Sequence, residues 1–576
     1  MLFASLHSSR DTCFRQSAIE TFTLEGADIS NFYFDVNLRH FFHLTKESAP
    51  VVAFGGVGMI VGDLSAGQAL DQGSAVVVIL PRYGFIRNDT FLRRFSFCYG
   101  GKLLKGQLSM LTQANTTYVF ISAPSHCSQL WRSSHSENIY DIPKSCRRMG
   151  FEVDDRDLYY SMVAAQIVGN CRDLHSLWSH CDPRNSVGVH IHSAHNSPAA
   201  LFLRSKRFDA QLAILYVMHD YNNEPYVFYV SRKLYYYIPM SEVVCVHADA
   251  PQAWEIAAVT THKVAASEMI ACADLIVLVS RGMLTDLLQS SPQTAQLLRQ
   301  FKAHRRLVSI GNWVTKPTWT NARRYVRLED PTRGKLHART IVFNQLVPLA
   351  RHASDIGRPE CLVLWIGRFD INKGIAAIPQ LIRASCNANC AFAVMGYSPN
   401  LRIARQLRHQ LNHAAAKEVC PIYSLDIHEQ RQYGMLLRAA ADVVTITSAT
   451  EAYGLVVAEA LAYGSIPVVS AVGGMPEIVV PFTEMTRKTW TGIVFEFRPN
   501  DWVFDVRSAS DALMHALSLL REQTPEELDQ LRKRSIVSTR TSDHGLNEYR
   551  SCIESVLNDA KSSSHTLTLD IGCKSL

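Results

Sequence analysis

Short apolar runs that alternate with amphipathic stretches recur along most of the chain. The first runs are HFFHLT at residues 40–45 and AVVVIL at residues 75–80, and the glycine-rich segment 51–70 between them predicts a turn followed by a helix. Apolar runs this short are typical of strands buried on both faces of a parallel sheet. Strand, helix and strand in succession therefore predict one βαβ unit.

Two series of such runs follow one another. The first continues through residues 117–122, 187–192, 212–217 and 275–279, and the second comprises residues 361–369, 390–396, 441–448 and 465–471. Two successive series of alternating strands and helices predict two doubly wound α/β domains. Ligands of such sheets bind outside the carboxyl ends of the strands, so we expect a site in a cleft between the domains.

The same pattern suggests domain boundaries. We predict an N-terminal extension (1–38), an N-terminal Rossmann-like domain (39–315), a charged, proline-containing linker (316–358), a C-terminal Rossmann-like domain (359–540) and a C-terminal helix and tail (541–576).

Composition narrows the class of protein. The 576 residues are 47% hydrophobic and 19% charged, which excludes a wholly disordered, collagenous or coiled-coil chain. The net charge of +6 is low for a nucleic-acid binder. We find no apolar run long enough for a transmembrane helix and no secretory signal pattern, and we interpret the 14 scattered cysteines as mostly buried thiols. These features predict a cytoplasmic protein without an integral membrane segment.

The first candidate site is the glycine loop at Gly55 and Gly56, between a predicted strand and a predicted helix. Glycines let backbone amides approach a phosphate, and a helix N-terminus favours the negative charge. A tight turn without a ligand is the alternative.

Two cations follow the first strand of the second series. Arg368 and Lys373 lie in GRFDINKG, so both belong to the carboxyl end of that strand. A guanidinium and an ammonium together neutralise a diphosphate. The alternative is a pair of solvated loop cations.

Two acids frame the start of a later helix. Glu451 follows the strand at 442–447, and Glu459 lies eight residues further on, about 12 Å along a helix that begins near Gly454. That separation is similar to the distance between the sugar and the ribose of a nucleotide sugar. Two surface acids are the alternative.

A histidine cluster closes another strand. His190, His192 and His195 follow one another closely, and His219 ends the next strand. We interpret His190 and His192 as facing opposite ways, and no Asp, Glu or Cys lies nearby, so we expect no metal site and at least one ordinary core histidine.

Together these motifs resemble the retaining nucleotide-sugar glucosyltransferases of the glycogen and starch synthase family, which have the two-domain GT-B fold. Residues 47–58 are similar to that family's opening strand and K-x-G-G-L loop, and residues 190–203 to its H-x-H-D-W-H segment. The family's R-x-x-x-x-K-G and the E-x7-E of related retaining enzymes match Arg368 with Lys373 and Glu451 with Glu459. The C-terminal half is most similar to the synthase domain of fungal α-1,3-glucan synthases.

The chain departs from the family on the acceptor side. Ala53 replaces the lysine of the glycine loop, and Ser193-Ala194 replaces the D-W of the histidine segment. Nucleotide-sugar binding is therefore better supported than glucan extension.

The resemblance implies transfer of glucose from ADP- or UDP-glucose to an α-glucan, without a metal or other cofactor. It assigns Arg368 and Lys373 to the diphosphate, Glu451 to the glucose hydroxyls and His195 to the reacting sugar. The implied donor-binding set is Gly55, Gly56, Gly454, Leu455, Glu459, Gly473 and Gly474. The alternative is a non-catalytic or regulatory homologue that binds glucan or nucleotide sugar, and a transferase of the same fold with another donor or a small acceptor also stays open.

Overall fold

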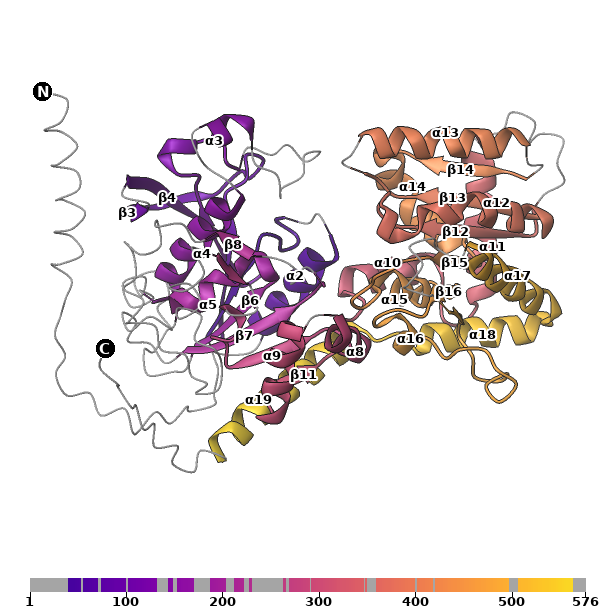
Figure 1. The fold of residues 1–576 in the computed structure, drawn as a ribbon. Helices are drawn as coiled ribbons and strands as arrows, with labels where there is room; N and C mark the ends of the chain where they lie inside the picture. Colours follow the sequence, from indigo (N-terminus) through magenta and orange to yellow (C-terminus); the bar gives the residue numbers. More distant parts are fainter. Residues whose placement is uncertain are drawn as a thin grey trace, which may run out of the picture. The chain divides into compact units, whose positions relative to one another are not determined.

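The structure is a computed structural model, and it divides the chain into two compact units (Figure 1). Unit 1 comprises the residues up to Leu278, Leu287–Val308 and the residues from Glu548 onward, and unit 2 comprises Val279–Asp286 and Ser309–Asn547. The described residues are 40–52, 55–70, 74–99, 102–131, 143–148, 153–169, 187–203, 212–221, 227–229, 263–265, 269–290, 292–346, 348–349, 359–398, 401–417, 420–496 and 506–562.

The sheet of unit 1 is doubly wound. Its nine described strands have the order β11-β10-β7-β6-β1-β2-β5-β4-β3, so the chain starts in the middle, builds outward on one side and then returns to build the other. The bounds are β1 (His40–Leu44), β2 (Ala75–Pro81), β3 (Thr90–Tyr99), β4 (Lys102–Gln113), β5 (Thr116–Ile121), β6 (Val187–His192), β7 (Leu212–Met218), β10 (Leu275–Leu278) and β11 (Leu307–Ser309). The strands β8 (Val227–Tyr229) and β9 (Lys263–Ala265) form a separate antiparallel pair.

The apolar runs became central parallel strands because both of their faces are covered. β2 pairs in parallel with β1 and with β5, and its residues beyond Ala75 are buried. The antiparallel strands β3 and β4 extend one edge of this sheet and carry polar residues between apolar ones. The helices associated with this sheet are α2 (Gly56–Ala69), α3 (Lys144–Arg148), α4 (Val153–Gly169), α5 (Pro198–Leu203), α8 (Arg281–Ser290) and α9 (Pro292–Ala303).

The sheet of unit 2 is parallel throughout. Its six described strands have the order β14-β13-β12-β15-β16-β17, which is 3-2-1-4-5-6 in chain order and places the switch point between β12 and β15. The bounds are β12 (Cys361–Ile366), β13 (Cys390–Met395), β14 (Ile422–Leu425), β15 (Val443–Ile446), β16 (Ile466–Ser470) and β17 (Ile493–Phe495). Both sheets confirm the predicted fold class of doubly wound α/β domains.

Helices surround this second sheet (Figure 1). One face packs against α12 and α17 through a core that includes Trp365, Leu381, Phe392 and Leu513. The helices are α10 (Lys316–Tyr325), α11 (Pro331–Gln345), α12 (Ile378–Asn387), α13 (Leu401–Lys417), α14 (Ile427–Ala440), α15 (Leu455–Ala462), α16 (Met475–Ile478), α17 (Val506–Glu522) and α18 (Pro525–Val537). The last helix, α19 (Ser542–Ser562), begins in unit 2 and belongs to unit 1 from Glu548 onward. No helix among the described residues is both long and apolar enough to cross a membrane.

Two expectations from the sequence differ from the structure. Residues 316–358, interpreted as a linker, contain α10 and α11. Proline lies in the first turn of both helices, as the second residue of α10 and the first of α11, where its missing N–H costs no hydrogen bond. These prolines therefore mark helix starts and not a linker.

The cysteines are the second difference. Six of the described cysteines form the disulfides Cys127–Cys146, Cys361–Cys390 and Cys386–Cys420, so the expectation of free thiols is wrong for them. Disulfides are typical of oxidising compartments. They therefore do not favour the cytoplasmic location that the sequence predicted.

Candidate functional site

The predicted phosphate-binding residues of unit 2 lie at the switch point of its sheet. Arg368 and Lys373 follow β12, and Glu451 follows the neighbouring strand β15. The carboxyl ends of adjacent parallel strands meet at one edge of a sheet, and ligands of this fold bind where the strand order reverses. The topology therefore brings the three residues to the edge at which a ligand is expected.

Lys373 and Glu451 form an ion pair with each other. Lys373 Nζ lies 2.6 Å from Glu451 Oε2, and the two side chains are 19% and 23% exposed. Ser448 Oγ donates to the same carboxylate oxygen at 3.3 Å. The sequence analysis assigned the ammonium and the carboxylate to different parts of a ligand, whereas the structure joins them, so each group fixes the position of the other.

Arg368 is the exposed cation of this edge. No hydrogen bond or ion pair joins its guanidinium to another residue in the described part of the chain. It precedes a short 3₁₀ turn, Ile371–Lys373, which ends at Gly374 with φ 66°. A left-handed residue there favours glycine, and it separates this turn from a second 3₁₀ turn, Ile375–Ala377, that leads into α12.

Hydrogen bonds join the loops after β12 and β15. Thr447 Oγ1 donates to the carbonyl of Lys373 at 2.9 Å and accepts from Trp365 Nε1 at 3.0 Å. The amide of Ala449 donates to the carbonyl of Asn372 at 2.7 Å. These contacts hold the backbones beside Lys373 and Glu451 together, so the backbone positions of the ion pair are fixed before a ligand binds.

The start of α15 carries the next predicted residues. Gly454 has φ 104°, a conformation that side chains rarely adopt, and a Cβ there would lie 2.7 Å from Met475 Cγ. Leu455 is the first residue of the helix. Glu459 lies on the same helix and forms an ion pair with Arg438 Nε at 3.4 Å.

The loop after β16 packs closely on a segment that sequence reasoning did not select. Gly473 donates its amide to Asp286 Oδ2 at 3.2 Å, and a Cβ on Gly474 would lie 2.6 Å from Ser280 Cβ. A Cβ on Gly282 would lie 1.9 Å from the carbonyl oxygen of Gly473. The glycines therefore serve close backbone packing, and the Gly473 amide, predicted as a ligand donor, already has a partner.

The glycine loop of unit 1 also differs from its predicted role. Gly55 is the residue before α2, and its amide donates to Glu47 Oε2 at 2.8 Å. A carboxylate already occupies the donor that we expected for a phosphate. Gly56 begins the helix, and Ala53 lies outside the described residues.

His195 belongs to a buried charged network. Its Nδ1 lies 3.1 Å from Asp157 Oδ2, and Arg156 Nε donates to Asp157 Oδ1 at 2.7 Å. Lys46 Nζ also contacts Asp157 Oδ1. The Asp157 side chain has no exposed surface, whereas His195 is 18% exposed. One carboxylate on α4 thus orients the imidazole and holds two cations beside it.

Electrostatics fix the charges of this network. Burial lowers the pKa of His195, and the Lys46 ammonium lowers it further against the opposing effect of Asp157, so the imidazole is neutral near pH 7. Burial alone would raise the pKa of Asp157, but Lys46 and Arg156 hold it well below its usual range. Asp157 is therefore ionised, and a neutral His195 donates to it through Nδ1 and leaves Nε2 as an acceptor.

Backbone strain lies beside this network. Ser193 has φ 67° and ψ 155°, which is unfavourable for any residue other than glycine, and its amide donates to the carbonyl of Val217 at 3.2 Å. Ser193 is the residue that replaces the aspartate of the family's D-W pair. Strain of this kind persists only where surrounding contacts enforce it, and it turns the chain from β6 towards His195.

The interpretation of the other histidines was wrong in one respect. Residues two apart in a strand share a face, so His190 and His192 point to the same side of β6. The ring nitrogens of His43, His190 and His192 lie within 4.8 Å of one another, and all three side chains are buried. His190 and His192 are core histidines, while His195 lies in the turn beyond the strand.

Two of these residues had a signal in the sequence that we did not use. Lys46 follows the buried strand β1 directly, which is the position that identified Arg368. Asp157 lies within an apolar helix, α4, where an acid requires a partner. The contacts of residues 280–286 carried no local signal, because they depend on glycines far away in the chain.

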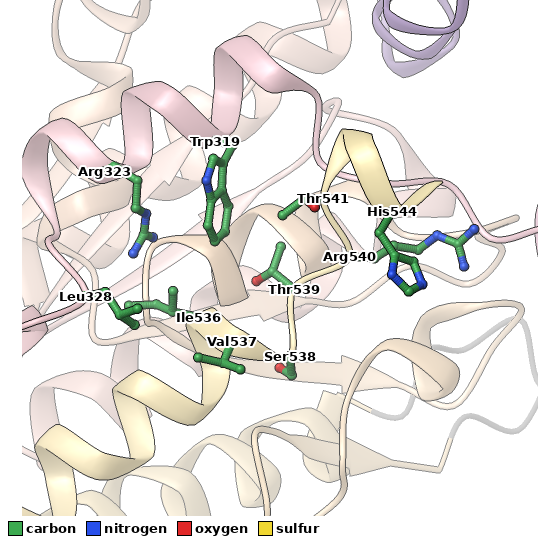
Figure 2. Close-up of a pocket in the computed structure, with 10 residues that line it drawn as sticks. All are labelled: Trp319, Arg323, Leu328, Ile536, Val537, Ser538, Thr539, Arg540, Thr541 and His544. Atoms are coloured by element: carbon green, nitrogen blue, oxygen red, sulfur yellow. The ribbon is translucent and has the colours of Figure 1, made fainter. Parts of the chain in front are cut away.

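A separate pocket of about 590 Å³ lies in unit 2 between α10, the end of α18 and the start of α19 (Figure 2). The Arg323 guanidinium lies 4.5 Å from the centre of the Trp319 ring there, and Arg540 and His544 come from the other side. None of the predicted site residues lines this pocket.

The two units match two glycosyltransferase families. Residues 40–300 match the family described as starch synthase catalytic domain, and residues 350–523 match glycosyl transferases group 1. The catalytic domain of starch synthase IV from Arabidopsis thaliana, solved with ADP and acarbose, superposes with a TM-score of 0.67 at 18% identity, covering 91% of this chain and 100% of that one. The chain therefore has the GT-B glycosyltransferase fold.

Curated relatives are glycogen and starch synthases. A probable glycogen synthase 2 of Nostoc sp. is 27% identical over 173 residues, which are 30% of this chain and 33% of that protein. Starch synthase 1 of Triticum aestivum is 24% identical over 294 residues, which are 50% of this chain and 42% of that protein. The matched regions thus span less than half of either relative. The chain is therefore similar to glycogen and starch synthases in both units and shares the fold of glycosyltransferases.

Proposed function

We propose that the chain is a retaining glucosyltransferase that transfers glucose from ADP- or UDP-glucose to an α-glucan. The observation that carries the proposal is the Lys373–Glu451 pair at the switch point of unit 2, beside the exposed guanidinium of Arg368. A cation and an acid held together at a ligand-binding edge suit a substrate that carries both phosphates and sugar hydroxyls.

Each residue of that edge has a role in the proposed reaction. Arg368 and Lys373 offset the negative charge that develops on the departing diphosphate, a preorganised electrostatic contribution. Glu451 accepts hydrogen bonds from the glucose while its ion pair holds Lys373 in place. Glu459 binds the ribose and would exchange its Arg438 contact for that hydrogen bond.

The bond changes follow from retention of configuration. The acceptor hydroxyl oxygen bonds to the anomeric carbon on the face from which the diphosphate leaves, the bond from that carbon to the phosphate oxygen breaks, and the hydroxyl proton passes to the diphosphate. Cations and amides can stabilise this leaving group, so the proposed transfer needs no metal. His195 binds the reacting sugar through its Nε2, and Asp157 is the positioning residue behind it.

A second function has observations in its favour. The Gly55 amide is occupied by Glu47, the Gly473 amide by Asp286, and Ser193 replaces an acid of the histidine segment. A regulatory homologue that binds nucleotide sugar or glucan without transferring glucose would retain these features. Arg368, Lys373 and Glu451 are all present, however, and favour the enzyme.

The test is release of ADP or UDP from ADP-glucose and UDP-glucose, with and without glycogen or maltooligosaccharides. Arg368→Ala and Glu451→Ala are compared with Lys417→Ala, which removes an exposed cation in the last turn of α13. We expect glucan-dependent release that falls by about 100-fold or more in the first two variants and stays unchanged in the third.

The outcomes separate the two functions. Calorimetric binding of a nucleotide sugar without turnover on any acceptor would favour the regulatory homologue. No binding of either nucleotide sugar would contradict both. Linkage analysis of the product tests the closer similarity to α-1,3-glucan synthases that the C-terminal motifs suggest, and fractionation of the native cell tests the cytoplasmic location.

A further inference from the structure

Three buried histidines lie together at the switch point of the sheet of unit 1, and the proposed transfer does not use them. His43 of β1 is the register partner of His190 of β6, and His192 lies two residues further along the same face. The three side chains are at most 1% exposed, and their ring nitrogens lie within 4.8 Å of one another. We call this set the three-histidine cluster.

Each ring is held from outside by a hydrogen bond. His43 Nε2 lies 2.7 Å from Gln68 Oε1 of α2, and His190 Nδ1 lies 3.0 Å from the Tyr549 hydroxyl of α19. His192 Nδ1 lies 2.9 Å from His219 Nε2, beyond β7. All three outer groups can accept a hydrogen bond, so each ring can carry its hydrogen outward and turn a lone pair inward. Metal-binding histidines have this arrangement, in which the second nitrogen donates to a fixed partner.

One of the three inner nitrogens has no partner among the protein groups that the structure describes. His43 must donate through Nε2, because the amide oxygen of Gln68 only accepts, so its Nδ1 bears a lone pair that faces His192 Nε2 at 3.1 Å. His190 Nε2 is buried and has no hydrogen-bond partner in the part of the chain that the structure describes. A buried nitrogen without a partner costs about 1–3 kcal/mol, whichever tautomer the ring adopts.

We propose that the three-histidine cluster binds one divalent transition-metal ion of the zinc class. Neutral imidazoles suit zinc, copper and nickel. Zinc–nitrogen bonds of about 2.0–2.1 Å place tetrahedral ligand atoms roughly 3.3 Å apart. The inner ring nitrogens lie within 4.8 Å of one another, so small rotations of the rings bring their three lone pairs to one ion. The fourth position stays open to water. The bound ion joins β1 and β6 directly and α2 and α19 through their hydrogen bonds.

This site is independent of the proposed transfer, because none of its residues belongs to the edge that carries Arg368 or to the His195 network. Its natural rival is a chain of neutral imidazoles, in which His219 donates to His192, His192 donates to His43, and His43 donates to Gln68. That chain satisfies three of the rings but leaves His190 Nε2 without a partner.

The experiment measures metal content and not activity. The full chain without an affinity tag is folded with Zn²⁺, dialysed against a weak chelator and analysed by mass spectrometry of the elements, beside His190→Gln and the exposed control His409→Gln. We expect one zinc per chain in the wild type and the control and at least a tenfold loss in His190→Gln. Less than about a tenth of an ion per wild-type chain, or equal content in His190→Gln, would overturn the proposal.

A second variant keeps the test valid if His190→Gln does not fold. Tyr549→Phe removes only the hydroxyl that holds His190, and loss of such an outer partner weakens metal binding about 10–100-fold. Co²⁺ in place of Zn²⁺ reports on the ligands directly, because a tetrahedral site gives intense visible absorption. Tetrahedral bands that weaken in Tyr549→Phe would support the site, and octahedral bands or an unchanged affinity would refute it.

Discussion

Asp157 has the largest number of charged contacts of any single side chain in the candidate site. It holds His195, Lys46 and Arg156 at once, with no exposed surface of its own. Its replacement by Asn would keep the shape but remove the charge that orients the imidazole. We therefore expect Asp157→Asn to lower kcat/KM for glucosyl transfer by about 100-fold, measured from nucleotide release.

The same change leaves the buried Arg156 guanidinium without its anion, while Lys46, whose pKa burial already lowers to about 7, can lose its proton, so stability must be measured beside activity. Breaking such a pair costs about 3–5 kcal/mol, which urea titration detects. If the positioning role is right, the folded variant binds nucleotide sugar normally but turns over slowly with an altered pH profile. Full activity in the folded variant would contradict that role.

At the residue scale, the sequence predicted where reactive groups would lie better than what they would contact. Arg368, Lys373 and Glu451 were identified because each follows a buried strand, which is a local property. The pairing of Lys373 with Glu451 and the occupation of the Gly55 amide by Glu47 depend on how loops meet. The spacing of residues along the chain does not predict such contacts between loops.

Among the elements, α15 depends on its first turn. Gly454 → Ala places a methyl group 2.7 Å from Met475 Cγ and forces an L side chain into φ 104°. We expect a loss of about 1–3 kcal/mol in the free energy of unfolding of unit 2, read from the urea midpoint, together with weaker nucleotide-sugar binding. Gly434→Ala in the middle of α14 is the matched control, because helix propensity favours Ala there and the nearest atoms are the flexible side-chain ends of Met395 and Arg438. Equal effects at both positions would argue against backbone strain.

Asp442 joins four elements of unit 2. It lies before β15, accepts from Arg532 Nη2 of α18 at 2.6 Å and from the Leu362 amide of β12 at 3.0 Å, and contacts Arg339 of α11. Burial would raise the pKa of Asp442, but Arg339, Arg532 and Lys335 outweigh it and lower that pKa. The ionised Asp442 carboxylate and its arginine partners therefore stabilise the folded state above about pH 4, and this contribution is lost as the pH falls further.

We expect Asp442→Asn to destabilise unit 2 by about 3–5 kcal/mol at pH 7, because Arg532 stays buried without its anion. Urea midpoints of wild type and variant should begin to converge below about pH 4, where the unfolded chain takes up the proton, and meet only as the pH falls through the lowered pKa of Asp442 in the folded wild type. A difference that is independent of pH would mean that shape and not charge is responsible.

At the element scale, the strands were predicted best. β5, β6, β7 and β10 lie within a residue of their expected bounds, because continuous apolar runs report burial on both faces. The sequence did not predict the antiparallel strands β3 and β4, because polar residues interrupt their apolar positions and leave no continuous apolar run. The helices α10 and α11 were taken for a linker because charged residues outweigh their apolar face.

For the whole molecule, the three disulfides are the most directly testable feature. They close loops with sequence separations of 19, 29 and 34 residues, each of which contributes about 3–4 kcal/mol in the chain-entropy picture. We expect peptide mapping without reductant to recover the three linked pairs, and reduction to lower the unfolding midpoint. Cys272, a buried cysteine outside these three pairs, is the internal control and should react only after unfolding. Alkylation of all six cysteines in native, unreduced protein would contradict the pairing.

The overall architecture followed from the order of strands and helices, since two series of alternating elements allow few topologies. The pairing of distant segments did not follow. Tyr549 lies far along the chain from His190, and nothing near either residue predicts the hydrogen bond between them.

That bond has a consequence for synthesis on the ribosome. Unit 1 includes residues from Glu548 onward, so the part of α19 that carries Tyr549 is made after the whole of Ser309–Asn547 has been added. At roughly 5–20 residues per second this addition lasts on the order of 10–50 s. Throughout that interval His190 has no hydroxyl partner, and the first domain to be started is the last to be completed.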